Sequence, residues 1–200
     1  MSELDCPLLQ RRAVVARILA ARGDALVVTG LGSTTYDAFA AGDSPLTFYL
    51  WGAMGAAAMI GLGLANAQPL RRVVVLTGDG EMLMGLGSLA TIGAERSKNL
   101  SVVVIDNEHY AETGMQRTHT GRGVDLAGIA KAAGFAHAEQ VRTPEQLANI
   151  APRIYSLTGP VFVTVKVAAG PSEVTLPPRD GTYLRSRFRA ALLGESKASE

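Results

Sequence analysis

Short, continuous apolar runs alternate along the chain with longer stretches in which apolar residues recur at helical spacing. The short runs are rich in β-branched residues, which is typical of strands buried on both faces of a parallel sheet. Their alternation with helices predicts an α/β fold, a doubly wound, mostly parallel sheet with helices on both faces. The predicted strands cover residues 25–29, 73–77, 101–105 and 161–167, and the predicted helices cover approximately 34–41, 53–66, 82–96, 125–133, 143–156 and 181–193.

Length and composition predict one well-packed domain. The chain has 200 residues, of which 48% are hydrophobic and 18% charged, and this is enough apolar material for a buried core. No long linker divides it, so we expect a single α/β domain over residues 1–193. The last residues, 194–200, are small and charged, and we expect them to form a flexible tail.

Charge and cysteine content exclude several classes of protein. Lys and Arg number 19 against 18 Asp and Glu, so no long-range field favours nucleic acid or an anionic membrane. Cys6 is the only cysteine, which excludes an internal disulfide and favours a cytoplasmic protein. The N-terminal segment has the spacing of an amphipathic helix and not that of a secretion signal. The apolar run at 50–65 is shorter than the roughly 20 residues of a membrane span.

Ligands of doubly wound sheets bind beyond the carboxyl ends of the strands, which here selects the loops at 30–33, 78–81 and 106–116. The second loop begins with Gly78, Asp79 and Gly80. Glycine lets the backbone approach a phosphate closely, and the carboxylate of Asp79 adds a hard oxygen ligand. Because a carboxylate repels a bare diphosphate, this combination predicts a divalent cation, Mg²⁺, between the two.

Gly-Asp-Gly alone is weak evidence for a ligand site, since it is also typical of ordinary turns. The third loop strengthens the prediction of a site. One helix and one strand after Gly78, the chain reaches Asp106 and Asn107 at the end of another buried strand. The two loops therefore come from neighbouring strands at one edge of the sheet, where Asp79 and Asn107 can share one ion.

Together these motifs resemble the signature of the thiamine-diphosphate-dependent enzymes, a Gly-Asp-Gly separated by a helix and a strand from Asn-Asn or Asp-Asn. The resemblance covers most of the chain and implies the diphosphate-binding domain of that family, with thiamine diphosphate and Mg²⁺ as cofactors. It implies that the Asp79 carboxylate, the Asn107 side chain and the backbone carbonyl of His109 ligate Mg²⁺, which two diphosphate oxygens and a water would complete to an octahedron. The family often has glycine in place of His109, but a carbonyl ligand tolerates any side chain. The residues that the resemblance assigns to the cofactor are Gly52, Met54, Gly78, Asp79, Gly80, Glu81, Asn107, His109 and Tyr110.

The segment around Met54 resembles a further family element, Gly-x-[large apolar]-Gly. In those enzymes the large apolar residue is a wedge between the two rings of the cofactor, and Met54 is the catalytic residue that the resemblance implies. The alternative is that Met54 is a core residue of a helix rich in glycine and alanine.

Residues 109–116 (HYAETGMQ) resemble the Thr-Gly-x-Gln segment of the sulfopyruvate and phosphonopyruvate decarboxylase branch, and the run GVDLAGIAKAAGF that follows also fits that branch. Arg117, His119 and Arg122 come next. They can meet an anionic substrate, since guanidinium binds carboxylate, sulfonate and phosphonate well, or they can form a solvated basic loop. His119 and His137 have no carboxylate or cysteine at ligand spacing, so we assign neither to a metal.

The resemblance implies a β-type subunit of a split 2-oxoacid decarboxylase, a lyase. Full-length relatives contain two such domains, so the activating glutamate of the pyrimidine domain would come from an α-type partner subunit in a hetero-oligomer. An acetolactate-synthase-like carboligase and a non-catalytic module that binds thiamine diphosphate or a nucleotide are the alternatives. A 2-oxoacid:ferredoxin oxidoreductase is disfavoured because its iron–sulfur clusters need cysteines. The sequence leaves open which 2-oxoacid is the substrate, and the partner's identity and stoichiometry.

Overall fold

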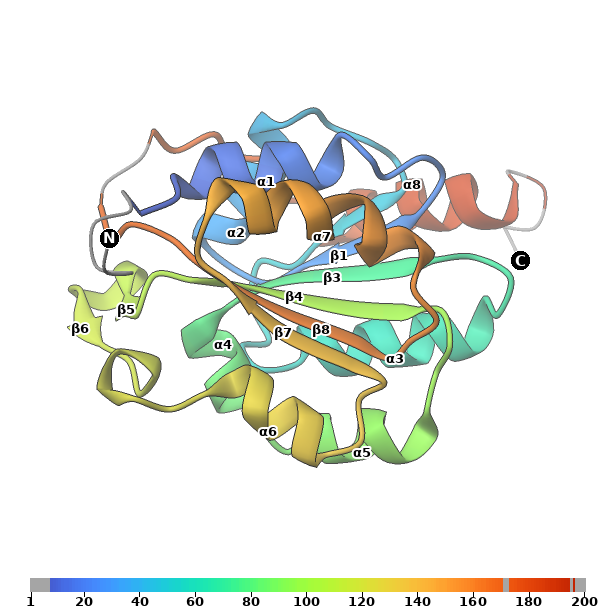
Figure 1. The fold of residues 1–200 in the computed structure, drawn as a ribbon. Helices are drawn as coiled ribbons and strands as arrows, with labels where there is room; N and C mark the ends of the chain where they lie inside the picture. Colours follow the sequence, from blue (N-terminus) through green and yellow to red (C-terminus); the bar gives the residue numbers. More distant parts are fainter. Residues whose placement is uncertain (1–7, 171–172, 195, 197–200) are drawn as a thin grey trace.

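The computed structural model describes residues 8–170, 173–194 and 196. Within these residues, six strands form one sheet in the order β2-β1-β3-β4-β8-β7 (Figure 1). Every neighbouring pair of strands in it is parallel, which confirms the predicted fold class. The strands are β1 (Leu26–Thr29), β2 (Thr47–Tyr49), β3 (Val73–Gly78), β4 (Leu100–Asp106), β7 (His137–Val141) and β8 (Val161–Lys166).

Helices cover both faces of this sheet (Figure 1). Alternate residues of a strand point to opposite faces, so Val74 of β3 joins one hydrophobic cluster and Val75 joins the other. One cluster packs against α1 (Arg11–Leu19), α2 (Ser33–Ala40) and α7 (Pro144–Ser156). The other packs against α3 (Ala57–Ala67), α4 (Asp79–Met84), α5 (Ser88–Glu95) and α6 (Leu126–Ala132). Helix α8 (Gly181–Leu193) contributes to both clusters through Leu184 and Phe188.

Two of the predicted helices were wrong in their extent. The helix predicted over 53–66 begins only at Ala57, because Ala53 and Gly55 have positive φ angles of 56° and 89° and form a loop. The helix predicted over 82–96 is two helices, α4 and α5. Helix α4 ends before Gly85, and α5 begins at Ser88. An added Cβ at Gly85 would lie 2.1 Å from the carbonyl oxygen of Gly55, so the backbone at Gly85 contacts the backbone of the loop around Gly55.

The structure also contains strands that the apolar pattern did not predict. The edge strands β2 and β7 are short, and β7 is mostly half-buried, so neither forms a continuous apolar run. A hairpin of β5 (His109–Tyr110) and β6 (Gln116–Arg117) follows β4. Its turn contains the short 3₁₀ helix η2 (Ala111–Thr113), and a second, η3 (Thr120–Arg122), comes after it. This hairpin lies at the carboxyl edge of the sheet (Figure 1).

The ends of the chain are described only in part. The amphipathic helix predicted near the N-terminus is α1. Cys6 lies outside the described residues, and so does the predicted tail at 194–200 except for Gly194 and Ser196. None of the helices in the described part of the chain has the length and apolar character needed to cross a membrane.

Candidate cofactor site

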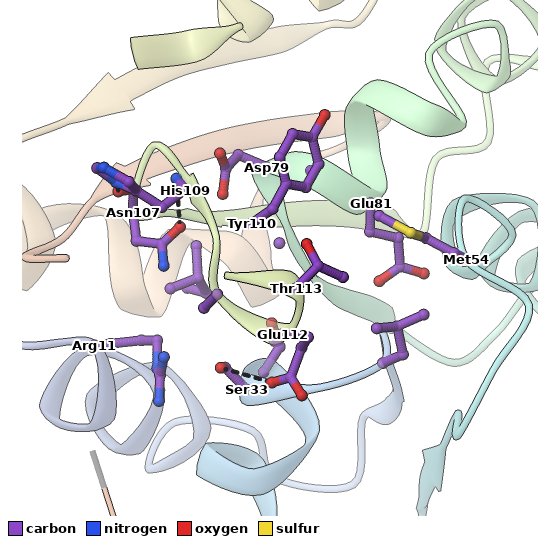
Figure 2. A pocket seen from close by; sticks show the side chains of 16 residues that line it. Arg11, Ser33, Met54, Asp79, Glu81, Asn107, His109, Tyr110, Glu112 and Thr113 are labelled. Atoms are coloured by element: carbon purple, nitrogen blue, oxygen red, sulfur yellow. Dashed lines mark hydrogen bonds between the residues drawn. The ribbon is translucent and has the colours of Figure 1, made fainter. Parts of the chain in front are cut away.

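The carboxyl ends of β1, β3 and β4 surround a cavity of about 140 Å³ that is open to solvent. Figure 2 shows that side chains from loops far apart in the sequence point into it. All three loops selected from the sequence contribute to its walls. The lining residues are Arg11, Leu31, Ser33, Thr34, Met54, Gly78, Asp79, Gly80, Glu81, Ile105, Asn107, His109, Tyr110, Ala111, Glu112 and Thr113.

Asp79 is a buried carboxylate at the centre of this site, with a residue exposure of 2%. Its Oδ2 accepts a hydrogen bond from the hydroxyl of Thr118 at 2.5 Å, and the hydroxyl oxygen of Thr120 lies 3.3 Å from the same atom. Burial, and secondly the negative charge of Asp106, raise the pKa of Asp79 to about 6, although the two hydroxyls act in the opposite direction. A cation beside Asp79 would therefore relieve an unfavourable buried charge.

Asn107 and His109 follow β4 in a tight turn in which Glu108 has a φ of 63°. The side-chain oxygen of Asn107 accepts a hydrogen bond from the backbone N–H of His109 at 3.0 Å. The imidazole Nδ1 of His109 lies 2.8 Å from the backbone carbonyl oxygen of Asn107. These contacts fix the turn, and both residues line the same cavity as Asp79. The structure thus brings together the three residues that the sequence proposed as metal ligands.

Glu81 is a second buried carboxylate, with a residue exposure of 5%, and it ties three loops together. Its Oε2 accepts a hydrogen bond from the hydroxyl of Thr77 at 2.9 Å. An added Cβ at Gly30 would lie 1.7 Å from the same oxygen, so only glycine fits there. Burial raises the pKa of Glu81, while Thr77 and the backbone N–H groups of Ala57, Leu31 and Gly55 lower it. The carboxylate is thus held by Thr77 at the end of β3 and lies against Gly30 of the first loop.

Met54 lies in that loop and not in a helix core, and 37% of it is exposed. The side chain lines the cavity at the end opposite Arg11 (Figure 2). This placement removes the interpretation of Met54 as a buried helix residue. Gly52 precedes it without lining the cavity, and a Cβ added at Gly52 would meet no atom within 4 Å.

The hairpin of β5 and β6 forms one wall of the site. The ring of Tyr110 lies against Gly80, where an added Cβ would come within 2.5 Å of it. Glu112 accepts a hydrogen bond from the hydroxyl of Ser33, at 3.3 Å, across the cavity (Figure 2).

Several residues that line the cavity or contact Asp79 had no role in the sequence-based prediction. Ser33 and Thr34 fall in or beside the first selected loop, but nothing in that loop distinguished them. Thr118 and Thr120 point inward, whereas Arg117, His119 and Arg122 are exposed and do not line the cavity. The alternation of Thr118 and Thr120 with basic residues was the signal in the sequence that could have identified the two threonines as inward-pointing. The exposure of Arg117, His119 and Arg122 favours the interpretation of these three residues as a solvated basic loop.

In open parallel sheets, ligands bind in the crevice beyond the carboxyl ends of the strands, which is where these glycines and the buried carboxylate lie. The profile of the family described as "Thiamine pyrophosphate enzyme, C-terminal TPP binding domain" matches residues 30–165, so the chain belongs to this family. The implied assignment to a thiamine-diphosphate-dependent enzyme is confirmed.

Named relatives lie in one branch of this family. The chain is 38% identical over 190 residues to the sulfopyruvate decarboxylase subunit beta of Methanothermobacter thermautotrophicus, covering 95% of this chain and 99% of the relative. It is 37% identical over 182 residues to the phosphonopyruvate decarboxylase of Streptomyces viridochromogenes, covering 90% of this chain but 45% of that protein. The solved structure of the thiamine diphosphate-dependent 4-hydroxybenzoylformate decarboxylase of Rhodococcus jostii RHA1 superposes with a TM-score of 0.68. That match has 16% identity and covers 86% of this chain and 36% of the other, so it supports the fold alone.

Proposed function

We propose that this chain, as a single domain over residues 1–193, is the diphosphate- and Mg²⁺-binding subunit of a split thiamine-diphosphate-dependent 2-oxoacid decarboxylase. Sulfopyruvate and phosphonopyruvate are the proposed substrates, because relatives named for both are similar over at least 90% of the chain. The observation that carries the proposal is the convergence of Asp79, Asn107 and His109 on one cavity at the strand ends of a domain of this family.

The residues present fit the proposed cation. In the described part of the chain, no three His, Cys, Asp or Glu side chains form a metal cluster, so a site here depends on amide and carbonyl oxygens as well. Asp79 and Asn107 supply hard oxygens, as does the backbone carbonyl of His109, and Mg²⁺ prefers such ligands together with phosphate oxygens. Burial, and then the charge of Asp106, raise the pKa of Asp79, and a cation beside this carboxylate would stabilise its charged form.

The surroundings also fit a diphosphate. An added Cβ at Gly78 would meet only Thr34 Oγ1, at 3.9 Å, so the space before this glycine is open. In the proposal, Gly78, Gly80, Glu81 and Tyr110 shape the floor and wall of the diphosphate site. Met54 supports the cofactor rings beside Gly52. When bound, thiamine diphosphate supplies the nucleophilic carbon and the electron sink for decarboxylation. The chain itself positions it and excludes water.

A partner subunit follows from the lengths of the relatives. The chain spans almost the whole of a protein named as a beta subunit but about half of a phosphonopyruvate decarboxylase. Since the relative matched over almost its whole length is named a beta subunit, we infer a separate α-type subunit with the pyrimidine domain, which supplies the activating glutamate. None of the described acids of this chain is assigned that role.

Release of CO₂ tests this proposal. Sulfopyruvate, phosphonopyruvate and pyruvate are each incubated with the chain, Mg²⁺ and thiamine diphosphate, first alone and then with the candidate partner subunit. We expect activity only with the partner, and an Asp79→Ala chain with the partner is the inactive control. Full activity of the isolated chain would contradict the split enzyme.

The same reactions separate the alternatives. A carboligase of the acetolactate-synthase type would release CO₂ and join the remaining fragment to an added aldehyde or oxo acid, which product analysis detects. Binding of the cofactor without turnover of any 2-oxoacid would favour a non-catalytic module.

A further inference from the structure

Lys166 is a buried ammonium group at the end of β8, beside the proposed cofactor site. Its side chain is 7% exposed, and Nζ lies 2.8 Å from Asp106 Oδ2 and 2.8 Å from Glu108 Oε1. Lys166 and Asp106 are register partners of β8 and β4, which are neighbours in the sheet (Figure 1). A lysine is rarely buried unless it is paired, so this side chain has a specific function in the packing of these strand ends.

A continuous set of close polar contacts leads from Lys166 to Asp79. Asp106 Oδ1 accepts hydrogen bonds from the hydroxyl of Thr120, at 2.8 Å, and from the backbone N–H of Glu108, at 3.0 Å. Thr120 Oγ1 also lies 3.3 Å from Asp79 Oδ2, and Thr118 donates to the same oxygen at 2.5 Å. Only two hydroxyls thus separate the buried ion pair from the proposed metal ligand.

The proton count fixes the direction of these bonds. Each threonine hydroxyl has one proton to donate. The shorter contacts assign the proton of Thr118 to Asp79 and that of Thr120 to Asp106. Both hydroxyls approach Oδ2 of Asp79, so Oδ1 is the oxygen that we assign to the cation.

The charges explain why a lysine is needed. Asp79 and Asp106 are two buried carboxylates linked through Thr120. Without a cation of its own, Asp106 would compete with Asp79 for Mg²⁺ and for the threonine protons. Removal of one partner from a buried ion pair leaves an uncompensated charge, which strongly perturbs its surroundings.

We propose that Lys166 is a positioning residue for the metal end of the cofactor: it neutralises Asp106 and, through Thr120 and Thr118, holds Asp79 in the orientation that binds the cation. This inference rests on the proposed function. Lys166 does not itself contact the ligand. Groups that orient metal ligands in this way typically contribute about 10–100-fold to metal affinity.

Mn²⁺ is the probe for this role, because its free form gives an electron paramagnetic resonance signal that binding removes. The full chain, with its partner subunit present, is titrated with Mn²⁺ in saturating thiamine diphosphate. We expect Lys166→Met to weaken Mn²⁺ binding by about 10–100-fold. The double variant Asp106→Asn with Lys166→Met removes both charges but keeps an oxygen that accepts from Thr120. Its affinity should return to within about threefold of the wild type.

A control separates this role from general stability. Arg187 pairs with Asp43 at 2.6 Å, is 15% exposed and does not line the cavity. Arg187→Met should lower the melting temperature without changing the affinity for Mn²⁺.

The outcomes are distinct. Wild-type Mn²⁺ affinity in folded Lys166→Met, or a double variant as weak as the single one, overturns the proposal. If Lys166→Met does not fold, the Mn²⁺ affinity of Thr120→Val tests the proposal instead. This variant removes the hydroxyl between Asp106 and Asp79 and leaves the ion pair of Lys166 and Asp106 in place. A loss of about tenfold supports the proposal, and wild-type affinity overturns it. A wild-type chain that, with its partner subunit present, binds no Mn²⁺ in thiamine diphosphate would overturn the proposed function itself, and this assignment with it.

Discussion

Asp79→Asn should stabilise the chain in the absence of metal, although it removes the proposed Mg²⁺ ligand. Burial, and then the charge of Asp106, raise the pKa of Asp79 from an ordinary value of 3.8 to about 6. The difference of about 2 units corresponds to about 3 kcal/mol by which the folded state disfavours the charged carboxylate. The amide of asparagine carries no charge, and its oxygen can still accept the hydrogen bond from Thr118.

The sign of the pH dependence follows from the raised pKa. Between pH 3.8 and about 6 the folded chain holds a proton on Asp79 that the unfolded chain has lost. The stability of the metal-free wild type therefore rises as the pH falls through this window, and the full penalty is present above it. We expect Asp79→Asn to be more stable than the wild type by up to about 3 kcal/mol at pH 7.5, with little difference near pH 4.

Urea unfolding in EDTA at pH 7.5 and near pH 4 measures this effect. Asp43→Asn is the matched control with the opposite sign. Burial raises the pKa of Asp43, but hydrogen bonds from Arg187 and Tyr49 outweigh it and lower the pKa overall. That variant should be less stable than the wild type at pH 7.5. The reasoning would be refuted by an Asp79→Asn chain that, without metal, is no more stable than the wild type at pH 7.5.

Two further substitutions test the loops around the site. Met54→Ala should reduce turnover of the assembled enzyme more than it weakens cofactor binding. Because Met54 is 37% exposed, the loss of stability should be far less than the roughly 2–5 kcal/mol of a buried methionine. Met59→Ala, at 40% exposure on α3, is the control, and an unchanged kcat in Met54→Ala would exclude the wedge role. Gly30→Ala should destabilise the chain by about 1–3 kcal/mol and weaken cofactor binding, because the new Cβ displaces the carboxylate of Glu81. Gly63→Ala, with open space at the Cβ position inside α3, should instead be neutral or stabilising, and equal melting temperatures for the two alanine variants would contradict this role of Gly30.

The central strands were predictable because each is a continuous run of β-branched residues buried on both faces. β7 was not, since its sequence His137–Val141 is polar at several positions and lies half-buried at the edge of the sheet. The break between α4 and α5 depends on a backbone contact between Gly85 and Gly55, which are 30 positions apart, and no local periodicity reports such a contact.

In the candidate site, too, some residues were predictable from local sequence motifs and others depend on the tertiary fold. Asp79 and Asn107 were predictable because each follows a strand within a short motif. Thr118 and Thr120 reach Asp79 because the hairpin folds back, and Lys166 reaches Asp106 because β8 lies beside β4. No local sequence pattern predicts such a strand order. Met54 was assigned by its motif, yet the loop that exposes it required the positive φ angles of Ala53 and Gly55.

Calorimetric titration with thiamine diphosphate is the most direct test of the proposed site. The protein, with its partner subunit present, is titrated in Mg²⁺, in EDTA, and as the Asp79→Ala variant, whose fold is checked by circular dichroism. We predict saturable binding in Mg²⁺ that disappears in EDTA and in the folded variant. Binding of wild-type affinity in Asp79→Ala, independent of Mg²⁺, would contradict the account.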